Sequence, residues 1–543
     1  MKTKSKTLHI LMISILSLIF SCTNKTQEVT KGIIGLYFSE PDLTSIKGVS
    51  VLTSLNQKWN ESVDYEGDTS GEWDGYIISP FSGNVRFHVT TNKLLSLKIN
   101  NKDSIKIDEK GLEKVLTVKM KKGISYPINL VFYNPGKHED IGWFNIEWSW
   151  TGNENSNIPL ENLYYSEKEA EKLNFLNKIQ NEKLDKNELV YADVKNVVVY
   201  YESGRFAAWP ANNGIWSWGN EILVGYIRAY YKKNQYHHAI NRNKPSGSAL
   251  SRSVDGGETW ILEDSISLNW KDKDIELTTT KIDFSKTGFA LRNTNGIYHY
   301  SYDRGKNWKG PFKYPDFDLG ELTSRTDYLI KNANECLIFT SAKVEKVQAA
   351  LQDRAMTIKT SDGGLNYEFV SWMTELDSIR SVMPATIRID QNHLVSALRR
   401  RLDPPKGKKF ALSKNWIDVY DSQDNGKSWQ FLNKIANTDT GIHNGNPPSM
   451  VKLKSGALCI IYGYRGLPYG IHAKISSDDG KTWSKEIVLR EDAISWDLGY
   501  LRSIVREDGK VASVYYYATK ERPERHIAAT IWDPMGIITN SKK

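Results

Sequence analysis

A short turn motif recurs five times in the C-terminal two thirds of the chain and restricts the folds it can adopt. Each copy has the pattern Ser/Thr-x-Asp-x-Gly-x-x-aromatic. The copies are SVDGGETW (253–260), SYDRGKNW (301–308), TSDGGLNY (360–367), SQDNGKSW (422–429) and SSDDGKTW (476–483). Their Asp positions are separated by 48, 59, 62 and 54 residues. A turn of one type that recurs at this spacing predicts a fold built from repeated units.

The composition of the motif indicates a structural role. Its Asp carboxylate can accept hydrogen bonds from backbone N–H groups of the same turn, and its Gly can adopt the positive φ that the turn needs. The aromatic residue can fold back over the hairpin. We therefore interpret the five copies as turns that stabilise the repeated units, and we look for chemistry elsewhere.

The segments between the motifs predict the type of unit. Apolar runs such as EILVGYI, ALCIIYGY and VASVYYY lie between them, and some fifty residues per unit suffice for a four-stranded antiparallel sheet. The pattern resembles the Asp-box β-propeller of the sialidase superfamily, which implies six blades with the last completed by a strand from the start of the domain. Asp-boxes also occur in lyases, other glycosidases and non-enzymes, so the fold alone does not define the function.

Composition limits the number of domains and the partners. A length of 543 residues predicts more than one domain, and 40% hydrophobic residues are sufficient for packed cores. The 17 Trp and 28 Tyr residues suit both blade cores and sugar binding. The net charge of +8 is spread among acidic residues, which argues against a nucleic-acid partner and is compatible with an anionic ligand.

The N-terminus predicts export. Three Lys residues precede an apolar run from Leu8 to Phe20 that ends at Ser21-Cys22. Residues 1–22 have the pattern of a secretory signal and are too short to form a spanning helix. The sequence IFSC resembles a bacterial lipoprotein signal, which implies a lipid on Cys22 and a membrane as partner. The expected location is the cell envelope, at the outer membrane surface or in the periplasm. An ordinary cleaved signal is the alternative.

A second β domain is predicted at residues 31–165. Apolar and polar residues alternate there between Gly, Pro and Asn turns, which is typical of an all-β sandwich. The segment resembles the protective-antigen-type (PA-fourteen) module, including the closing stretch 158–165. That family often binds carbohydrate, in some members through an Asp pair that holds calcium. The corresponding loop here, TTNKLLS (90–96), has no acidic pair.

The whole chain is thus predicted to be all-β, an N-terminal β-sandwich followed by a six-bladed Asp-box β-propeller. The charged segment 166–188 lacks Pro and Gly and predicts a helical linker. The propeller is expected over residues 189–543.

The resemblance to sialidases implies an Arg clamp for a substrate carboxylate, since a guanidinium matches a carboxylate in shape and charge. Arg205 in RFAAWP and Arg465 in YGYRGLPYG match two of the family's positions. The middle position could be supplied by Arg399, Arg400 or Arg401, with Arg325 and Arg380 as further candidates. The residues predicted to bind substrate are Arg205, Arg325, Arg399, Arg465, Trp216 and His237.

Tyr500 aligns with the nucleophilic Tyr of the sialidase family. A phenol with its ordinary pKa is a poor nucleophile at neutral pH unless another group assists its ionisation. In the family a Glu has this role, but the matching stretch HNGNPPSMVKL (443–453) has Pro447 at that position. The acid/base Asp is expected in segment 236–252, which contains neither Asp nor Glu. A conventional sialidase mechanism is therefore disfavoured.

His and Tyr residues beside an Arg-bound carboxylate fit another reaction, β-elimination on a uronic acid. The predicted catalytic residues are His238, His443 and Tyr500. The predicted function is the breakdown of an acidic oligosaccharide or polysaccharide by a lyase or dehydratase that gives a 4,5-unsaturated uronate. The alternatives are an exo-glycosidase of the sialidase type and a non-catalytic glycan-binding lipoprotein.

No cofactor or metal is predicted. The three Cys residues, Cys22, Cys336 and Cys459, lack the spacing of a metal site or of a disulfide framework. Paired His ligands and Asp-rich loops are lacking from the sequence as well.

Overall fold

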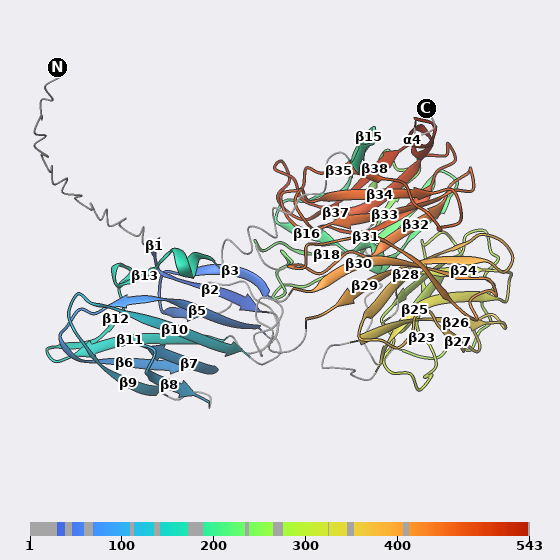
Figure 1. Ribbon diagram of the computed structural model, residues 1–543. Helices are drawn as coiled ribbons and strands as arrows, with labels where there is room; N and C mark the ends of the chain where they lie inside the picture. The colour runs from blue at the N-terminus through green and yellow to red at the C-terminus, as the bar shows by residue number, and fades with distance from the viewer. Residues whose placement is uncertain are drawn as a thin grey trace, which may run out of the picture.

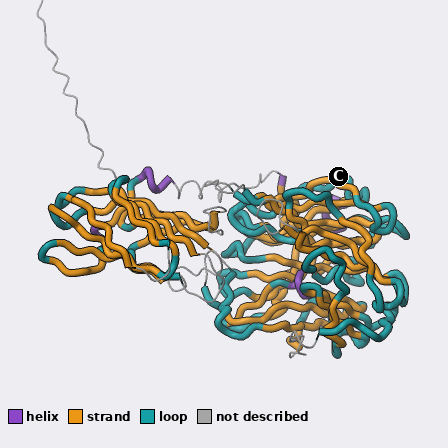
Figure 2. Tube along the Cα trace, turned by 90° about the horizontal axis from the view of Figure 1, so that it is seen from below, coloured by secondary structure: helices purple, strands orange, loops and turns teal. Residues whose placement is uncertain are grey.

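In the computed structural model, strands form nearly all of the regular structure, in two bodies that lie side by side (Figures 1 and 2). The described residues are 30–38, 46–58, 69–108, 113–134, 142–171, 188–233, 238–263, 275–323, 325–344, 352–404 and 412–540. The predicted signal segment, Cys22, His237 and most of the predicted linker lie outside them. Among the described residues, no helix has both the length and the apolar character needed to cross a membrane.

The N-terminal body is a sandwich of two antiparallel sheets. The larger sheet contains β1 (Thr30–Lys31), β2 (Ile33–Phe38), β3 (Ile46–Leu52), β5 (Thr69–Ile78), β7 (Leu94–Ile99), β8 (Asp103–Ile107), β10 (Ser125–Asn134) and β13 (Leu163–Tyr165), the last preceded by the short helix η1 (Leu160–Asn162). The smaller sheet contains β4 (Asn56–Lys58), β6 (Gly83–Thr91), β9 (Glu113–Met120), β11 (Trp143–Trp150) and β12 (Asn153–Asn157).

The alternation of residues along these strands explains the sandwich. In β6 and β9, apolar residues at every second position are buried, while the residues between them are more exposed. The buried side chains of both sheets form one core that contains Trp73, Phe87 and Trp148. Strands with period-two alternation bury one face each, so two such sheets pack face to face.

The C-terminal body consists of six antiparallel sheets, which we number as blades in chain order. Blade 1 contains β16 (Arg205–Ala208), β17 (Ile215–Trp218), β18 (Glu221–Tyr230), β19 (Gly247–Ser253) and β20 (Ile261–Glu263). Blade 2 contains β21 (Ala290–Thr294), β22 (Ile297–Ser301) and β23 (Lys309–Lys313). Blade 3 contains β24 (Tyr328–Ile330), β25 (Cys336–Val344), β26 (Gln352–Thr360) and β27 (Glu368–Trp372).

Blade 4 contains β28 (Arg380–Arg388), β29 (Leu394–Leu402), β30 (Lys414–Ser422) and β31 (Gln430–Asn437). Blade 5 contains β32 (Pro448–Lys452), β33 (Leu458–Tyr464), β34 (Gly470–Ser476) and β35 (Glu486–Arg490), with β14 (Leu189–Tyr191) added in parallel to β35. Blade 6 contains β36 (Gly499–Val505), β37 (Val511–Tyr517), β38 (His526–Trp532) and β15 (Val194–Tyr200). Helix α4 (Pro534–Asn540) follows β38.

Apolar packing closes these sheets into a ring. Each blade shares a hydrophobic cluster with the next one, from blades 1 and 2 to blades 5 and 6. A further cluster joins blade 6 to blade 1. Blade 6 is completed by β15, which precedes blade 1 in the chain and pairs antiparallel with β38. This arrangement confirms the predicted β-propeller and leaves few free sheet edges.

The five Asp-box turns have the predicted structure. In the first, the carboxylate of Asp255 accepts a hydrogen bond from the backbone N–H of Thr259 at 2.9 Å, and Ser253 Oγ accepts one from the N–H of Gly257 at 2.8 Å. Gly257 has φ +94°, and the Trp260 indole N–H donates to its carbonyl at 2.9 Å. The same Asp and Ser/Thr bonds recur in the other four copies.

An apolar cluster joins the two bodies. Leu36, Phe38 and Ile46 of the sandwich pack with Ile442 of the propeller, together with Val131. Ile442 lies in the loop between blades 4 and 5, immediately before His443. The sandwich therefore contacts the loop that carries one of the predicted catalytic residues.

Candidate active site

A short helix lies on the axis of the propeller. Helix α3 (Pro210–Asn213) interrupts the innermost strand of blade 1 between β16 and β17. Three Arg side chains from other parts of the ring donate hydrogen bonds to it. Arg502 of β36 donates to the Ala211 carbonyl at 3.1 Å, and Arg292 of β21 donates to Asn213 Oδ1 at 2.6 Å. Arg325, which precedes β24, donates to Asn212 Oδ1 at 2.8 Å. The helix is thus tied to several blades at once, and it divides the centre of the ring into two sides.

Tyr500 lies at the start of β36 on one side of α3, packed with Ala211, Val382 and Met383. Its hydroxyl accepts a hydrogen bond from Arg399 Nη1 at 2.8 Å. Its backbone N–H donates to Asn446 Oδ1 at 2.9 Å. Asn446 immediately precedes Pro447, so the stretch 443–453 holds the backbone of Tyr500 in place.

Local backbone geometry holds Tyr500 in place. Gly499 has φ +98°, and a Cβ there would lie 2.2 Å from Asn446 Oδ1, so only Gly allows Asn446 to approach. Tyr500, Met383 and Trp209 all have positive φ, at 47°, 57° and 64°. Positive φ in bulky residues costs free energy and is concentrated at functional sites. Three such residues around α3 mark this side of the ring as the candidate active site.

Four guanidinium groups surround the Tyr500 phenol. Burial disfavours its ionisation, but the positive charges of Arg399, Arg465, Arg325 and Arg380 outweigh that cost and lower the pKa of Tyr500 to about 8. We call these four residues the arginine cluster. An anion in their midst is stabilised electrostatically.

The members of the arginine cluster differ in exposure and in partners. Arg380 keeps 33% of its side chain exposed and pairs with the buried carboxylate of Asp353. Arg325 is partly exposed and is held by Asn212 and Asn295. Arg399 is buried, and burial lowers its pKa to about 10. Its Nε has no hydrogen-bond partner in the described structure.

Arg465 has a different environment from the one expected of a substrate clamp. It is buried, and its guanidinium donates to the carbonyls of Leu498 and Asn444, at 3.0 and 2.5 Å, and to the hydroxyl of Tyr516 at 2.8 Å. Its guanidinium N–H groups thus donate hydrogen bonds to other groups of the protein. Arg465 therefore contributes charge and positions neighbouring groups.

A His–Asp pair lies beside Tyr516. His238 Nδ1 and Asp497 Oδ1 are 2.6 Å apart, and the Tyr516 hydroxyl donates to the same carboxylate oxygen at 2.8 Å. Asp497 Oδ2 accepts from the Ala239 N–H at 3.1 Å and from Arg525 Nε at 3.0 Å. Burial opposes the charge of Asp497, but His238 and Arg525 hold its pKa far below the usual range. Asp497 is thus a buried carboxylate that fixes the imidazole through Nδ1.

His238 remains accessible on its other side. Its side chain is 23% exposed, and its ring contacts the indole rings of Trp209 and Trp496, with centroids 5.1 and 5.7 Å away. The rings of Tyr516 and Tyr500 lie 6.4 Å apart. An imidazole oriented through Nδ1 can use Nε2 as a general acid or base.

His443 has a more enclosed position. Its ring stacks on Trp496 with centroids 4.2 Å apart and planes inclined by 6°, and the residue is 7% exposed. Arg465 also contacts Trp496, and its guanidinium carbon lies 5.2 Å from the ring centroid. His443 therefore belongs to the same site as His238, but it is buried by aromatic stacking.

Other predicted residues lie elsewhere. The Arg205 guanidinium stacks over the ring of Tyr230 at 4.0 Å and is not among the groups that lower the pKa of Tyr500. Trp216 lies on the opposite side of α3, packed against Trp308 and donating its indole N–H to the Leu291 carbonyl at 3.3 Å. The structure thus separates Trp216 from the arginine cluster with which it was grouped.

The two other Arg residues of β29 have acidic partners. Arg400 pairs with Asp377 at 2.8 Å and Asp418 at 3.3 Å, and Arg401 pairs with Asp403 at 2.6 Å. Of the three consecutive Arg residues, only Arg399 reaches Tyr500. Alternation along the strand explains the exclusion of Arg400, because successive side chains point to opposite faces. Arg401 lies on the same face as Arg399 but is held by Asp403.

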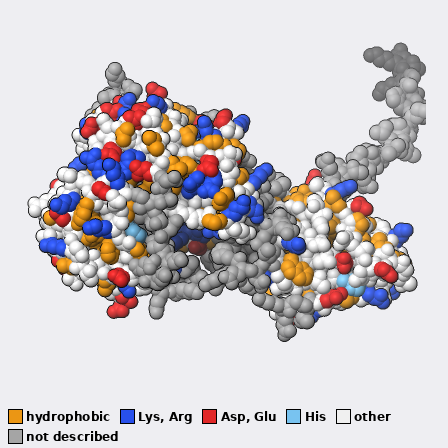
Figure 3. All heavy atoms as spheres, turned by 180° about the vertical axis from the view of Figure 1, so that it is seen from behind, with side chains coloured by type: hydrophobic (Ala, Val, Ile, Leu, Met, Phe, Trp, Pro, Cys, Tyr) orange, Lys and Arg blue, Asp and Glu red, His pale blue; other side chains and the backbone are white. Residues whose placement is uncertain are grey.

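Sequence reasoning missed Asp497, Trp209 and Trp496. Asp497 lies in SWDLGY, three residues before Tyr500, outside the stretches 236–252 and 443–453 in which the family resemblance implies an acidic group. In the described part of the chain, no group of three or more His, Cys, Asp or Glu side chains is placed to hold a metal ion. Figure 3 shows Lys and Arg side chains gathered on the propeller beside a hollow.

Comparisons with known proteins show which structures are similar. No family model matches the chain, and no curated protein matches it. Among solved structures, a protein of unknown function from Dyadobacter fermentans DSM 18053 is 21% identical, with 62% of this chain and 98% of that chain covered at a TM-score of 0.47.

Two further solved structures have lower scores. The α-L-arabinanase of Penicillium chrysogenum, solved with arabinobiose, is 13% identical over 63% of this chain and 98% of its own, at a TM-score of 0.39. The PA14 domain of the MpAFP antifreeze protein is 12% identical over 25% of this chain and 92% of its own, at a TM-score of 0.21.

Proposed function

We propose that the protein is a carbohydrate-active enzyme that acts on acidic oligosaccharides and cleaves uronic-acid-containing chains by β-elimination. The main support is the position of Tyr500, whose hydroxyl accepts a hydrogen bond from Arg399 inside the arginine cluster. The same positive charge attracts a substrate carboxylate and makes the phenol easier to ionise. The product would be a 4,5-unsaturated uronate.

In the proposed mechanism, the uronate carboxylate pairs with the partly exposed guanidinium groups of Arg325 and Arg380. Neutralising this carboxylate makes the C5 proton more acidic. The Tyr500 phenolate takes that proton, and the C5–H electron pair forms the C4=C5 double bond as the C4–O bond breaks. Protonated His238 gives the proton of Nε2 to the departing oxygen. Water then restores both groups to their starting protonation states.

Asp497 acts in this mechanism as a positioning residue. It accepts the Nδ1–H of His238 at 2.6 Å, which directs Nε2 outward. It is itself held by Tyr516 and Arg525. A buried carboxylate with this role orients a His general acid without contacting the substrate.

Hydrolysis by a glycosidase is the second function that Tyr500 allows, because a phenol with a lowered pKa is also a better nucleophile. A Tyr nucleophile of the sialidase type depends on a carboxylate that takes its proton. Among the described residues, the hydrogen-bond partner of the Tyr500 hydroxyl is Arg399, a cation. A cationic partner stabilises a phenolate base, so elimination is favoured.

The test is to incubate the full chain with a panel of uronate-terminated and sialylated oligosaccharides while recording near-ultraviolet absorbance and reducing sugar. Elimination gives new absorbance, which Tyr500→Phe and His238→Ala should abolish. Reducing sugar without absorbance would instead establish a glycosidase. Binding without either product would establish a glycan-binding protein and refute both enzymatic proposals.

We also propose that Cys22 carries a lipid that anchors the protein in the cell envelope, since the apolar run before it ends in IFSC. A single acyl chain gives only weak, reversible membrane binding, whereas two chains give stable attachment, so a diacyl group on Cys22 is sufficient. Incorporation of a labelled fatty acid into the full chain, and its loss in Cys22→Ala, is the expected result. A soluble, unlabelled product in both would contradict it.

A further inference from the structure

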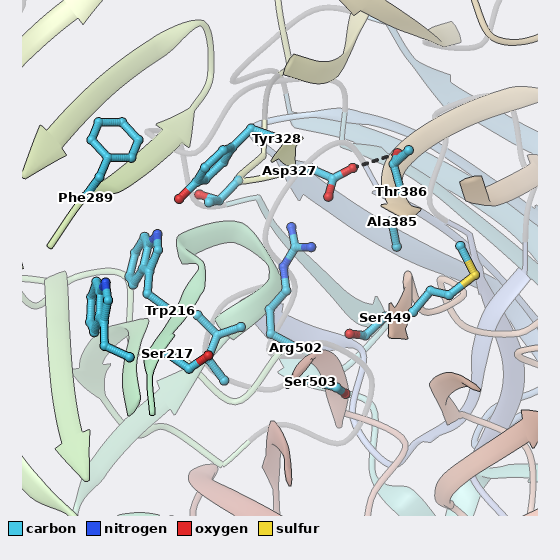
Figure 4. A pocket seen from close by; sticks show the side chains of 14 residues that line it. Trp216, Ser217, Phe289, Asp327, Tyr328, Ala385, Thr386, Ser449, Arg502 and Ser503 are labelled. Atoms are coloured by element: carbon cyan, nitrogen blue, oxygen red, sulfur yellow. Dashed lines mark hydrogen bonds between the residues drawn. The ribbon is translucent and has the colours of Figure 1, made fainter. Parts of the chain in front are cut away.

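A second candidate site lies on the side of α3 opposite to Tyr500. It is a cavity of about 330 Å³ formed by residues from five blades and two interblade segments. Its lining includes Trp216, Asp327, Thr386, Ser449, Arg502 and Ser503 (Figure 4). Helix α3 separates the two spaces, since Ala211 packs with Tyr500 and also accepts the hydrogen bond from Arg502.

Two opposite charges face each other across this cavity. Asp327 and Arg502 point toward one another in Figure 4, yet no ion pair joins them in the described structure. Asp327 Oδ2 accepts a hydrogen bond from Thr386 Oγ1 at 3.0 Å. Arg502 donates from Nη2 to Ala211, while its buried Nε has no hydrogen-bond partner.

Burial affects both groups. It raises the pKa of Asp327 to about 7 and lowers the pKa of Arg502. Each charge therefore lacks the compensation that a direct ion pair would supply. A molecule between them that both accepts and donates hydrogen bonds would satisfy the two groups together.

The other walls suit a hydroxylated ring. Ser449 and Ser503 are buried hydroxyl residues at the opposite wall from Tyr328 in Figure 4. Trp216 supplies an aromatic wall. Aromatic side chains with a few polar groups are typical of small-molecule sites, and this volume is at the small end of their range.

We propose that the cavity binds a neutral, polyhydroxylated molecule the size of a single sugar ring. One hydroxyl donates to the Asp327 carboxylate, and a neighbouring oxygen accepts from Arg502. A cationic ligand would meet the positive charge of Arg502, and an anionic one the charge of Asp327. This site is separate from the arginine cluster and does not depend on the function proposed for Tyr500.

The experiment is saturation-transfer NMR on the full chain with D-glucose, D-galactose and D-xylose as neutral probes and D-glucuronate and D-glucosamine as charged probes. At least one neutral sugar should give a signal. Ser449→Leu fills the cavity without removing a charge and should weaken that binding by about tenfold or more. Arg380→Ala, on the other side of α3, should leave it unchanged.

Several outcomes would overturn this proposal. They are the absence of binding by all neutral probes, a preference for a charged probe, and a neutral signal lost in Arg380→Ala but kept in Ser449→Leu. The last result would assign the sugar to the Tyr500 side. Thermal unfolding of Ser449→Leu serves as the folding control. Should that variant unfold early, Asp327→Asn gives the same test, because it replaces the carboxylate that accepts the sugar hydroxyl with an amide of similar shape.

Discussion

Arg399 and Tyr500 are joined by a hydrogen bond of 2.8 Å, although they come from blades 4 and 6 and are separated in the ring by blade 5. The bond therefore joins two blades that are not neighbours in the ring. It places a phenol in contact with a buried cation whose Nε has no hydrogen-bond partner in the described structure.

Replacing Tyr500 by Phe should reduce kcat by about 10² to 10⁴-fold with little effect on folding, because a positioned proton-transfer group contributes about that much. The backbone bond to Asn446 does not involve the lost hydroxyl. The measurement is the initial rate on a uronate-terminated oligosaccharide. Tyr201→Phe is the matched control, since it removes the hydroxyl of an exposed Tyr that donates to Glu524. Equal rates in both variants would remove Tyr500 from the mechanism.

The pH dependence should follow the ionisation of Tyr500. Its pKa is lowered to about 8, so kcat/KM should rise with pH through that value. Arg399→Met removes a positive charge and should shift this limb to higher pH, whereas Arg399→Lys should shift it less. The phenolate difference spectrum between the native protein and Tyr500→Phe measures the same pKa directly. An unshifted limb in Arg399→Met would show that another group controls it.

The same ionisation has a consequence for stability. In the unfolded chain, Tyr500 has the ordinary pKa of about 10, which is higher than its pKa in the folded protein. The phenolate therefore adds its full contribution to the free energy of unfolding only above about pH 10. The contribution disappears as the pH falls through about 8. At neutral pH it adds nothing, so Tyr500→Phe should not destabilise the protein through lost charge there.

Asp497→Asn should reduce both activity and stability. The carboxylate is buried and holds His238, Tyr516 and Arg525, and breaking such a buried ion pair costs about 3–5 kcal/mol. The pKa of Asp497 is far below normal, so its stabilisation is present above the unfolded carboxyl pKa and is lost only in strong acid. Urea unfolding at neutral pH measures the effect. Glu321→Gln, at an exposed ion pair with Lys343, is the control and should change stability little.

The scaffold could be predicted because its signals are local. Each Asp-box needs only a Ser or Thr, an Asp and a Gly within a few residues, as in Ser253, Asp255 and Gly257. Alternation along strands such as β6 is equally local. The position of Tyr500 and the presence of an Arg beside it came from the family resemblance. These elements did not require knowledge of distant contacts.

The details of the site could not be predicted for the opposite reason. His238 and Asp497 are 259 residues apart and meet only because blade 6 closes onto blade 1. Arg465 has the expected position, but its donors are occupied by Leu498, Asn444 and Tyr516. Helix α3 has only four residues and no period that reveals it. Its position on the axis is what separates Trp216 from Tyr500.

Gly499→Ala should displace Tyr500. An added Cβ would lie 2.2 Å from Asn446 Oδ1, at a residue with φ +98°, so both sterics and backbone conformation oppose the change. We expect lower activity and an earlier unfolding midpoint. Gly536→Ala is the control because nothing lies within 4 Å of its new Cβ. Activity retained in Gly499→Ala would show that the Asn446 contact does not position Tyr500.

The contact between the two domains should influence the site through Ile442. Phe38 of the sandwich and Ile442 of the propeller share one apolar cluster, and Ile442 precedes His443, which stacks on Trp496. Phe38→Ala and Ile442→Ala should each lower kcat/KM, and the double variant should lose less than the sum of the two losses, because residues in contact are coupled by about 0.5–3 kcal/mol. Phe87→Ala, in the separate core of the sandwich, should combine additively with Ile442→Ala. Additive effects for Phe38 and Ile442 would show that the sandwich does not hold the His443 loop in solution.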